Sequence, residues 1–171
     1  MDAAKIKDLE KRLGHEFTDK KELYRALTHP TFSKEERERK KGRRDCPHQE
    51  IYATLGDAVL KAGFVLLLMD RGLNTKGDIT IVKEDWENNL KLAGVGKRLH
   101  LPDDNLILHR RGEGEQLKQG TKKLCADTVE ALIGAIFLDT GRSFPETMVC
   151  ISKIFNPELQ DMEKRYRPGP L

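Results

Sequence analysis

The chain has 171 residues, the usual size of one domain and enough to bury a hydrophobic core. Hydrophobic residues make up 37%, charged residues 35% and aromatic residues 6%, a composition within the globular range that disfavours a β-sandwich or β-barrel. The net charge of +3 excludes a strongly acidic, solvating chain, and any nucleic-acid partner must be argued from where the charges lie.

The cysteines and the apolar segments favour a cytoplasmic protein. The three cysteines are an odd number without a Cys-x-x-Cys pair, which disfavours both a disulfide framework and a cysteine-rich zinc site. Reduced thiols are therefore expected. The first eight residues alternate in charge where a signal peptide needs an apolar core. The most apolar stretch, residues 58–69, contains Lys61 and is shorter than the ~20 residues of a membrane span, so no membrane partner is expected.

Apolar residues recur at helical spacing almost everywhere, which predicts an all-α fold. A first helix ends at Gly14. Asp19 begins a second helix, and Pro30 ends it because the residue before a proline is pushed out of the helical region. Residues 34–44 carry seven positive and three negative charges without an apolar anchor, which predicts a mobile loop.

Four more helices are predicted in the rest of the chain. The third, over residues 49–69, is apolar nearly all round in its second half and is expected to be the buried central helix. A fourth runs from about 80 to 101, and a fifth over 122–139 follows a basic loop at 110–121. The sixth begins after Ser143, a typical N-cap residue.

The domain organisation follows from these elements. Residues 1–156 are expected to form one domain, and residues 157–171 a flexible C-terminal tail without a second domain. No strand and no internal repeat is predicted.

Two of the predicted helices carry acidic residues inside apolar or small-residue stretches. Asp57 opens the buried half of the third helix, and Glu50 lies two turns before it on the same face. Asp127 and Glu130 are neighbours on the fifth helix because they are three positions apart. Buried carboxylates are rare unless they are paired or bind a metal, and an all-oxygen cluster suits Mg²⁺ or Mn²⁺. The alternative is that these acids lie on solvent-exposed helix faces and bind no metal.

The segments around these acids resemble a known family. Residues 48–60 read HQEIYATLGDAVL and resemble the signature HNERLEFLGDAVL of the ribonuclease III endonuclease domain. Residues 127–139 read DTVEALIGAIFLD and resemble its second motif, DxxEALIGAIYLD. Residues 9–14 and 26–29 match as well, so the resemblance covers the chain from Leu9 to about Phe155.

The resemblance implies the helical fold of that domain, a homodimer, and cleavage of double-stranded RNA with Mg²⁺, for which Mn²⁺ could substitute. Asp57, Asp127 and Glu130 match three of the four acids that bind metal in the family, and Asp57 and Glu130 are the expected catalytic residues. The fourth acid is replaced by Ala53. Glu50, one turn from that gap, matches another acidic position and is a further candidate metal ligand.

Other positions bear on activity and assembly. The short Mini-III branch of the family, which lacks a double-stranded-RNA-binding domain, also looks apolar at the position of Ala53, so its loss of an acid need not abolish activity. Lys76 stands where many members have an acid near the cleavage groove. The dimer is expected to form through the third helix, on the face with Tyr52 and Leu55.

The candidate RNA-binding residues are basic: Arg43, Arg44, His48, Lys122 and Lys123. Lys122 and Lys123 open the fifth helix ahead of Asp127, where a cation is unfavourable for the helix dipole and a bound anion would offset it. The basic run at 34–44 could track an RNA backbone or could be a solvated loop.

Three functions stay open at this point. The first is a metal-dependent endoribonuclease acting on double-stranded or structured RNA, with a role in RNA processing. The second is a catalytically weak or inactive RNA-binding module of the same fold, which the replacement at Ala53 keeps in view. The third is a helical metal-dependent nucleotide hydrolase, which the quality of the motif match disfavours.

Overall fold

The computed structural model describes residues 2–41, 46–102, 105–110 and 117–166, except for the side chains of 117–121. This part of the chain forms helices α1 (Ala3–Leu13), α2 (Lys20–Ala26), α3 (Pro30–Arg39), α4 (Glu50–Asp70), α5 (Lys76–Glu87), α6 (Asn89–Arg98), α7 (Leu117–Asp139), α8 (Phe144–Ile154) and α9 (Asn156–Arg165). Its residues form no strand, only an isolated parallel bridge between Thr28 and Leu108. The expected all-α fold is confirmed.

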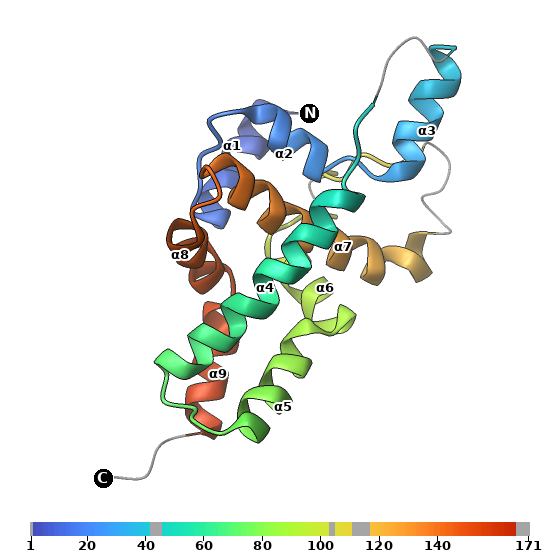
Figure 1. The fold of residues 1–171 in the computed structure, drawn as a ribbon. Coiled ribbons are helices and arrows are strands. Elements are labelled where there is room, and N and C mark those ends of the chain that lie inside the picture. Colours follow the sequence, from blue (N-terminus) through green and yellow to red (C-terminus); the bar gives the residue numbers. More distant parts are fainter. Residues whose placement is uncertain (1, 42–45, 103–104, 111–116, 167–171) are drawn as a thin grey trace.

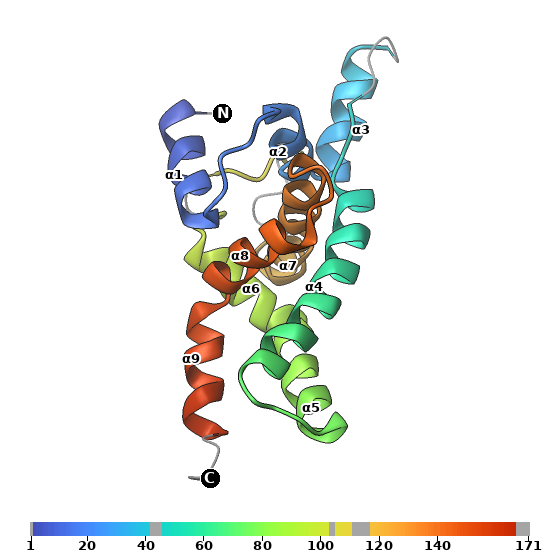
Figure 2. The same ribbon diagram turned by 60° about the vertical axis from the view of Figure 1, so that its left-hand side comes forward.

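The buried central helix is α7, and not α4 as expected from the sequence. Helices α2, α4, α6 and α8 all contact α7. Figures 1 and 2 show α4 crossing α7, with α5 and α9 at one end of the molecule and α3 standing away from it at the other. The outer side of α4 keeps apolar residues exposed, among them Ile51 and Met69. An apolar sequence alone does not say which of two long helices is covered on all sides.

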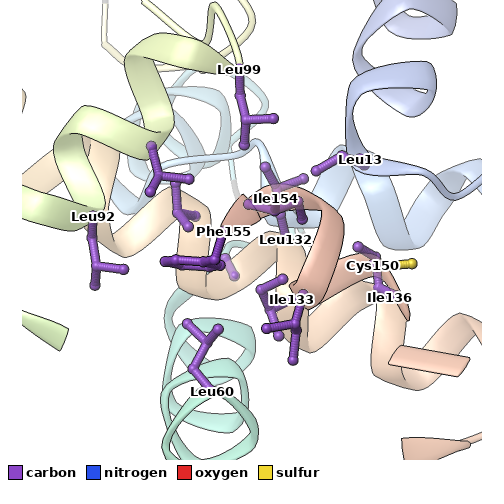
Figure 3. Close-up of a cluster of buried hydrophobic side chains, with 14 of the residues drawn as sticks. Leu13, Leu60, Leu92, Leu99, Leu132, Ile133, Ile136, Cys150, Ile154 and Phe155 are labelled. Carbon is purple, nitrogen blue, oxygen red and sulfur yellow. The ribbon is translucent and has the colours of Figure 1, made fainter. Parts of the chain in front are cut away.

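Aromatic and aliphatic side chains from several helices close the core around Phe155. Phe155 is fully buried, and its ring packs edge-to-face on that of Phe64 with centroids 4.7 Å apart. Figure 3 shows Phe155 among Leu60 of α4, Leu92 of α6 and Leu132 of α7. The helix pair α8–α9 is thereby fixed to the helices that carry the acidic residues.

Local signals in the sequence set several helix ends as predicted. Gly14 ends α1 in the left-handed conformation, with φ at +77°. Asp19 caps α2 by accepting a hydrogen bond from the Lys21 backbone N–H at 2.9 Å. Ser143 caps α8 by accepting one from the Glu146 N–H at 3.4 Å.

The first part of the basic segment, residues 34–39, is helical and was wrongly expected to be a loop, while residues 42–44 lie outside the described part of the chain. The previous helix, α2, ends at Ala26, before the residue that Pro30 restricts, and Pro30 itself occupies the first turn of α3, where its missing N–H costs nothing. The side chain of His29 caps this helix by accepting from the Thr31 N–H at 3.3 Å. Glu36 then pairs with Arg39 and Lys40 at helical spacing. Charge pairs and caps therefore make a helix without an apolar stripe.

Two further boundaries differ from those expected. The predicted fourth helix is two helices, because Asn88 is extended and its side chain caps α6 by accepting from the Lys91 N–H at 2.9 Å. The fifth helix begins at Leu117, inside the predicted 110–121 loop. Residues 111–116 lie outside the described part of the chain.

The segment expected to be a flexible tail is helical as far as Arg165. Helix α9 starts with a proline in its first turn and buries Leu159 and Met162. Arg98 of α6 also binds Glu158 at 2.7 Å. The helical core therefore extends beyond residue 156, and the last part of the predicted tail, residues 167–171, lies outside the described residues.

One helix of the described chain, α4, is long and apolar enough to cross a membrane by length and composition. The expectation that no segment reaches that length was therefore wrong. The core helix of a globular protein meets the same criteria, and Leu60, Phe64 and Leu68 of α4 are buried in the core.

Candidate active site

The acids that the sequence singles out line one surface cavity of about 850 Å³. Glu50 and Asp57 reach it from α4, and Asp127 and Glu130 reach it from α7. On α7, Asp127 and Glu130 are the two positions between 124 and 136 that are not buried. The cavity is thus the place where the central helix opens to solvent, and acids occupy that opening.

Two glycines hold the helices close together beside these acids. A Cβ added at Gly56 of α4 would lie 1.8 Å from the backbone oxygen of Glu130, and one added at Gly134 of α7 would lie 2.2 Å from that of Tyr52. The backbones are therefore in direct contact next to Asp57. A side chain at either glycine would separate the acids of α4 from those of α7.

A buried hydrogen bond fixes the start of α4 against α7. The Thr128 hydroxyl donates to the amide oxygen of Gln49 at 3.1 Å, and both residues are buried. A second contact comes from α2, where Arg25 Nε donates to the backbone oxygen of His48 at 3.3 Å, just before the start of α4. These contacts set the position of Glu50, at the first turn of α4.

The acidic side chains interact electrostatically. The pKa of the Glu130 carboxyl is raised to about 7, chiefly by burial and also by the nearby Asp57 and Asp127 carboxylates, with Lys61 opposing them. Burial also raises the pKa of Asp127, against the opposing charge of Lys123. Asp57 is paired with Lys61, whose Nζ lies 2.7 Å from its Oδ2. Glu130 therefore carries a proton that is easily lost near neutral pH.

The comparison with protein families points to one family. A family model described as ribonuclease-III-like matches residues 19–157, a span that includes every residue lining the cavity. The chain belongs to the ribonuclease-III-like family. The resemblance drawn from residues 48–60 and 127–139 is confirmed.

The relatives of this ribonuclease-III-like chain are longer than it is. Ribonuclease 3 of Delftia acidovorans is 36% identical over 164 residues, which cover 91% of this chain and 64% of that protein. Ribonuclease 3 of Bordetella pertussis is 38% identical over 144 residues, covering 82% of this chain and 50% of that protein. The chain thus spans about half to two thirds of the length of these relatives.

Solved structures show the same fold. The nuclease domain of ribonuclease III from Campylobacter jejuni matches with a TM-score of 0.73 and 26% identity over 99% of this chain and 100% of that one. A second structure of that domain, described for structural flexibility in its region involved in dimer formation, matches with a TM-score of 0.70 and 30% identity over 88% of this chain and 99% of that one.

The donor set at the cavity suits a hard cation, although the carboxylates do not meet around one point. No group of three His, Cys, Asp or Glu among the described residues lies close enough to hold an ion, so the expected convergence of Asp57, Asp127 and Glu130 was wrong for this structure. The four acids do offer oxygen atoms, which Mg²⁺ prefers. A bound cation would relieve the repulsion between these carboxylates. At Asp57 it would replace the positive charge of Lys61, which now pairs with that carboxylate. The residues fit the ion by their chemistry.

The structure places some of the other predicted site residues at the cavity and others away from it. Ala53 lines the cavity together with Glu50, so the gap in the family pattern lies at the site itself. Lys123 also lines it, whereas Lys122 is exposed on α7 outside the lining. Lys76 is exposed at the start of α5. The roles of these side chains stay predictions.

Two further predicted residues, Arg43 and Arg44, lie outside the described part of the chain, and His48 lines a neighbouring cavity.

Sequence reasoning missed three features of this site. His29 and Pro30 line the cavity, and the match of residues 26–29 to the family was the signal that could have placed them there. Lys61 lies four positions after Asp57, the spacing of a helical ion pair. The bond between Gln49 and Thr128 had no sequence signal, because it joins residues 79 positions apart.

The raised pKa of Glu130 predicts a pH-dependent stability in the absence of divalent metal. The folded chain holds this proton up to about pH 7, and the unfolded chain holds it only to about 4.5. Stability from this group is therefore complete below pH 4.5 and is lost as the pH rises through 7, by about 1–3 kcal/mol. Urea unfolding in EDTA at pH 5.5 and pH 8 should show that loss in the wild type and a smaller one in Glu130→Gln. Parallel profiles would contradict the assignment.

Proposed function

We propose that this chain is a metal-dependent endoribonuclease that hydrolyses phosphodiester bonds of double-stranded or structured RNA. The observation that carries the proposal is the open cavity between α4 and α7, lined by Asp57, Asp127 and Glu130 at the motif positions of the family. Its relatives are named Ribonuclease 3, and its fold is that of a solved ribonuclease III nuclease domain.

The chemistry follows from the residues at the cavity. Asp57, Asp127 and Glu130 would hold Mg²⁺ or Mn²⁺, with Glu50 at the start of α4 as a fourth candidate. When bound, such an ion neutralises charge on the phosphodiester and makes a water molecule more acidic. The Glu130 carboxyl, with its pKa near 7, can hold or release a proton at that place.

Basic side chains at the same opening favour an anionic substrate. Lys123 lines the cavity beside Asp127, and Lys122 is exposed one position before it. Their charges attract the RNA backbone to a site that is otherwise acidic. The three cysteines are free, which agrees with the reducing cytoplasm that we propose as its location.

The experiment is incubation of the chain with one long RNA duplex and with its separate strands, in Mg²⁺ and in EDTA. We expect the duplex to be cut internally in Mg²⁺ and to stay intact in EDTA, with the single strands cut more slowly. Binding of the duplex without cleavage in Mg²⁺ or Mn²⁺ would favour the inactive RNA-binding module instead, and hydrolysis of mononucleotides would favour a nucleotide hydrolase.

The RNA-binding module is kept as a second candidate because Ala53 lines the cavity where the family has a metal-binding acid. Ala53→Glu should raise the cleavage rate and lower the Mg²⁺ concentration for half-maximal activity, because a fourth carboxylate within ~4–6 Å of the ion adds attraction. If Glu50 already fills this role, Glu50→Gln should lower activity and Ala53→Glu should add little. A Mg²⁺ titration of cleavage by both variants separates these cases. If neither substitution changes cleavage, neither position contributes to metal binding.

We also propose that the chain forms a homodimer through the outer face of α4. Ile51, Leu66 and Met69 are apolar and between 42% and 67% exposed on that helix, which is unusual for three large side chains on one element. Tyr52 does not belong to this face, contrary to the sequence-based expectation, because it is buried and its hydroxyl donates to Glu22. Leu55 packs partly against the core.

Light scattering should give about twice the 19.5 kDa mass of one chain. Leu66→Glu should reduce this to one chain while leaving the urea midpoint nearly unchanged, because an exposed side chain contributes little to the stability of the monomer. A wild-type particle of 19.5 kDa at micromolar concentration would contradict the dimer.

A further inference from the structure

Helix α3 has two faces with different charge. On one face Glu36 is paired with Arg39 at 3.0 Å and with Lys40 at 2.5 Å, so these basic side chains are neutralised within the helix. On the other lie Lys34 and Arg37. These two side chains, and Lys41 just after the end of the helix, make no ion pair with any described residue. Unpaired cations on one face are available for an external anion.

The unpaired cations line a cavity of their own. This cavity, of about 600 Å³, is formed by Lys34, Arg37 and Lys41 together with Ser33, Glu38, Pro30 and His48. Three cations against the single carboxylate of Glu38 leave a net positive charge. Lys34 and Arg37 lie on one side of α3 because they are three positions apart, and Lys41 follows the end of the helix with φ at +49°.

This basic cavity adjoins the acidic one. Pro30 lines both, and His48 of the basic cavity is followed along the chain by Gln49 and Glu50 of the acidic cavity. The Nδ1 atom of His48 lies 3.5 Å from Glu50 Oε2. The two cavities are therefore close enough for one extended ligand to lie in both.

The base of α3 is fixed, although the helix stands away from the body of the molecule in both ribbon views (Figures 1 and 2). The His29 N–H donates to the Leu108 carbonyl at 2.8 Å, and the Arg110 N–H donates to the Thr31 hydroxyl at 3.3 Å. Ser33 also donates to the Cys46 carbonyl. Ten helical residues reach about 15 Å from this anchored end.

We infer that the basic surface formed by Lys34 and Arg37 of α3 and by Lys41 binds the phosphate backbone of duplex RNA beside the catalytic cavity. The inference rests on the proposed function, because it extends the path of the same substrate along the surface. The occupant is argued from charge complementarity and from continuity with the acidic cavity, since a polymer of phosphodiesters spans both. The surface acts in binding and does not take part in the chemical step.

The test compares charge changes on the two faces of α3. Lys34→Gln/Arg37→Gln removes two positive charges from the proposed surface, and Arg39→Gln/Lys40→Gln removes two from the opposite face as the control. Circular dichroism of both variants checks that α3 stays helical, because the control also removes the ion pairs with Glu36. Binding of a labelled RNA duplex is measured by fluorescence anisotropy in EDTA from about 50 to 300 mM NaCl. We expect the first variant to bind more weakly and the slope of log K against log salt to shrink by about 2, one for each phosphate that is no longer neutralised.

Two further measurements separate a binding role from a structural one. Glu38→Gln should tighten duplex binding, because it removes the carboxylate from the same cavity; damage to the helix would weaken it. In Mg²⁺, Lys34→Gln/Arg37→Gln should raise the KM for duplex RNA and leave kcat unchanged.

The outcomes distinguish this inference from the proposed function. Equal affinity and equal salt slope for the two double variants, in a chain that cleaves duplex RNA, would overturn the inference alone. A wild type that binds duplex RNA through α3 but never cleaves it would overturn the endoribonuclease and leave the inference standing. A wild type that does not bind duplex RNA would overturn both.

Discussion

Gly56→Ala should destabilise the fold by about 2 kcal/mol or more and should abolish cleavage of duplex RNA. The new Cβ would lie 1.8 Å from the Glu130 backbone oxygen, and a backbone atom cannot rotate away. Because this contact is with a backbone atom, the cost of overpacking lies at the upper end of its usual range, about 3 kcal/mol or more, against a gain of about 1 kcal/mol from the better helix propensity of alanine. Moving α4 away from α7 also separates Asp57 from Glu130.

The matched control is Gly94→Ala in α6. A Cβ added there meets no atom within 4 Å, so the change should stabilise the chain by about 0.5–1 kcal/mol through the helix propensity alone. Urea unfolding of the wild type and both variants measures the difference, with the midpoint moving down for Gly56→Ala and up for Gly94→Ala. Equal midpoints for wild type and Gly56→Ala would mean that α4 and α7 do not touch at this place.

The sequence predicted the parts of the fold that depend on local chemistry. Gly14, Asp19 and Ser143 set helix ends because a left-handed residue or a side-chain cap acts within a few positions. The acidic pair on α7 could be placed on one face for the same reason. Local spacing could not say which other helix carries acids to the same site. The family motifs identified that helix as α4.

The features that the sequence did not predict depend on contacts between residues far apart in the chain, or on small free-energy contributions that nearly cancel. Which of α4 and α7 is central depends on what covers each, and apolar content does not say that. The segment before Lys40 became a helix through pairs worth only tenths of a kcal/mol each, together with the cap by His29. The ion pair of Lys61 with Asp57 was visible in the spacing but became informative only when Asp57 was seen in the cavity.

Glu130→Gln should lower the rate of duplex cleavage by about 10²–10³-fold, because the amide keeps the shape of the side chain but can neither carry the negative charge nor exchange a proton. Asp57→Asn should act in the same direction. Neither change should impair folding, since Glu130 is a partly buried acid whose ionisation is already unfavourable there. Duplex binding in EDTA should stay within a few-fold of the wild type, because the basic residues are unchanged.

The most direct measurement is therefore single-turnover cleavage of one RNA duplex in Mg²⁺ by the wild type and by Glu130→Gln, with duplex affinity measured for both. The cavity between α4 and α7 is the active site if the wild type cleaves, the variant is slower by about 10²-fold or more, and both bind the duplex alike. Equal cleavage rates, or a wild type that binds the duplex and leaves it intact in both Mg²⁺ and Mn²⁺, would contradict it.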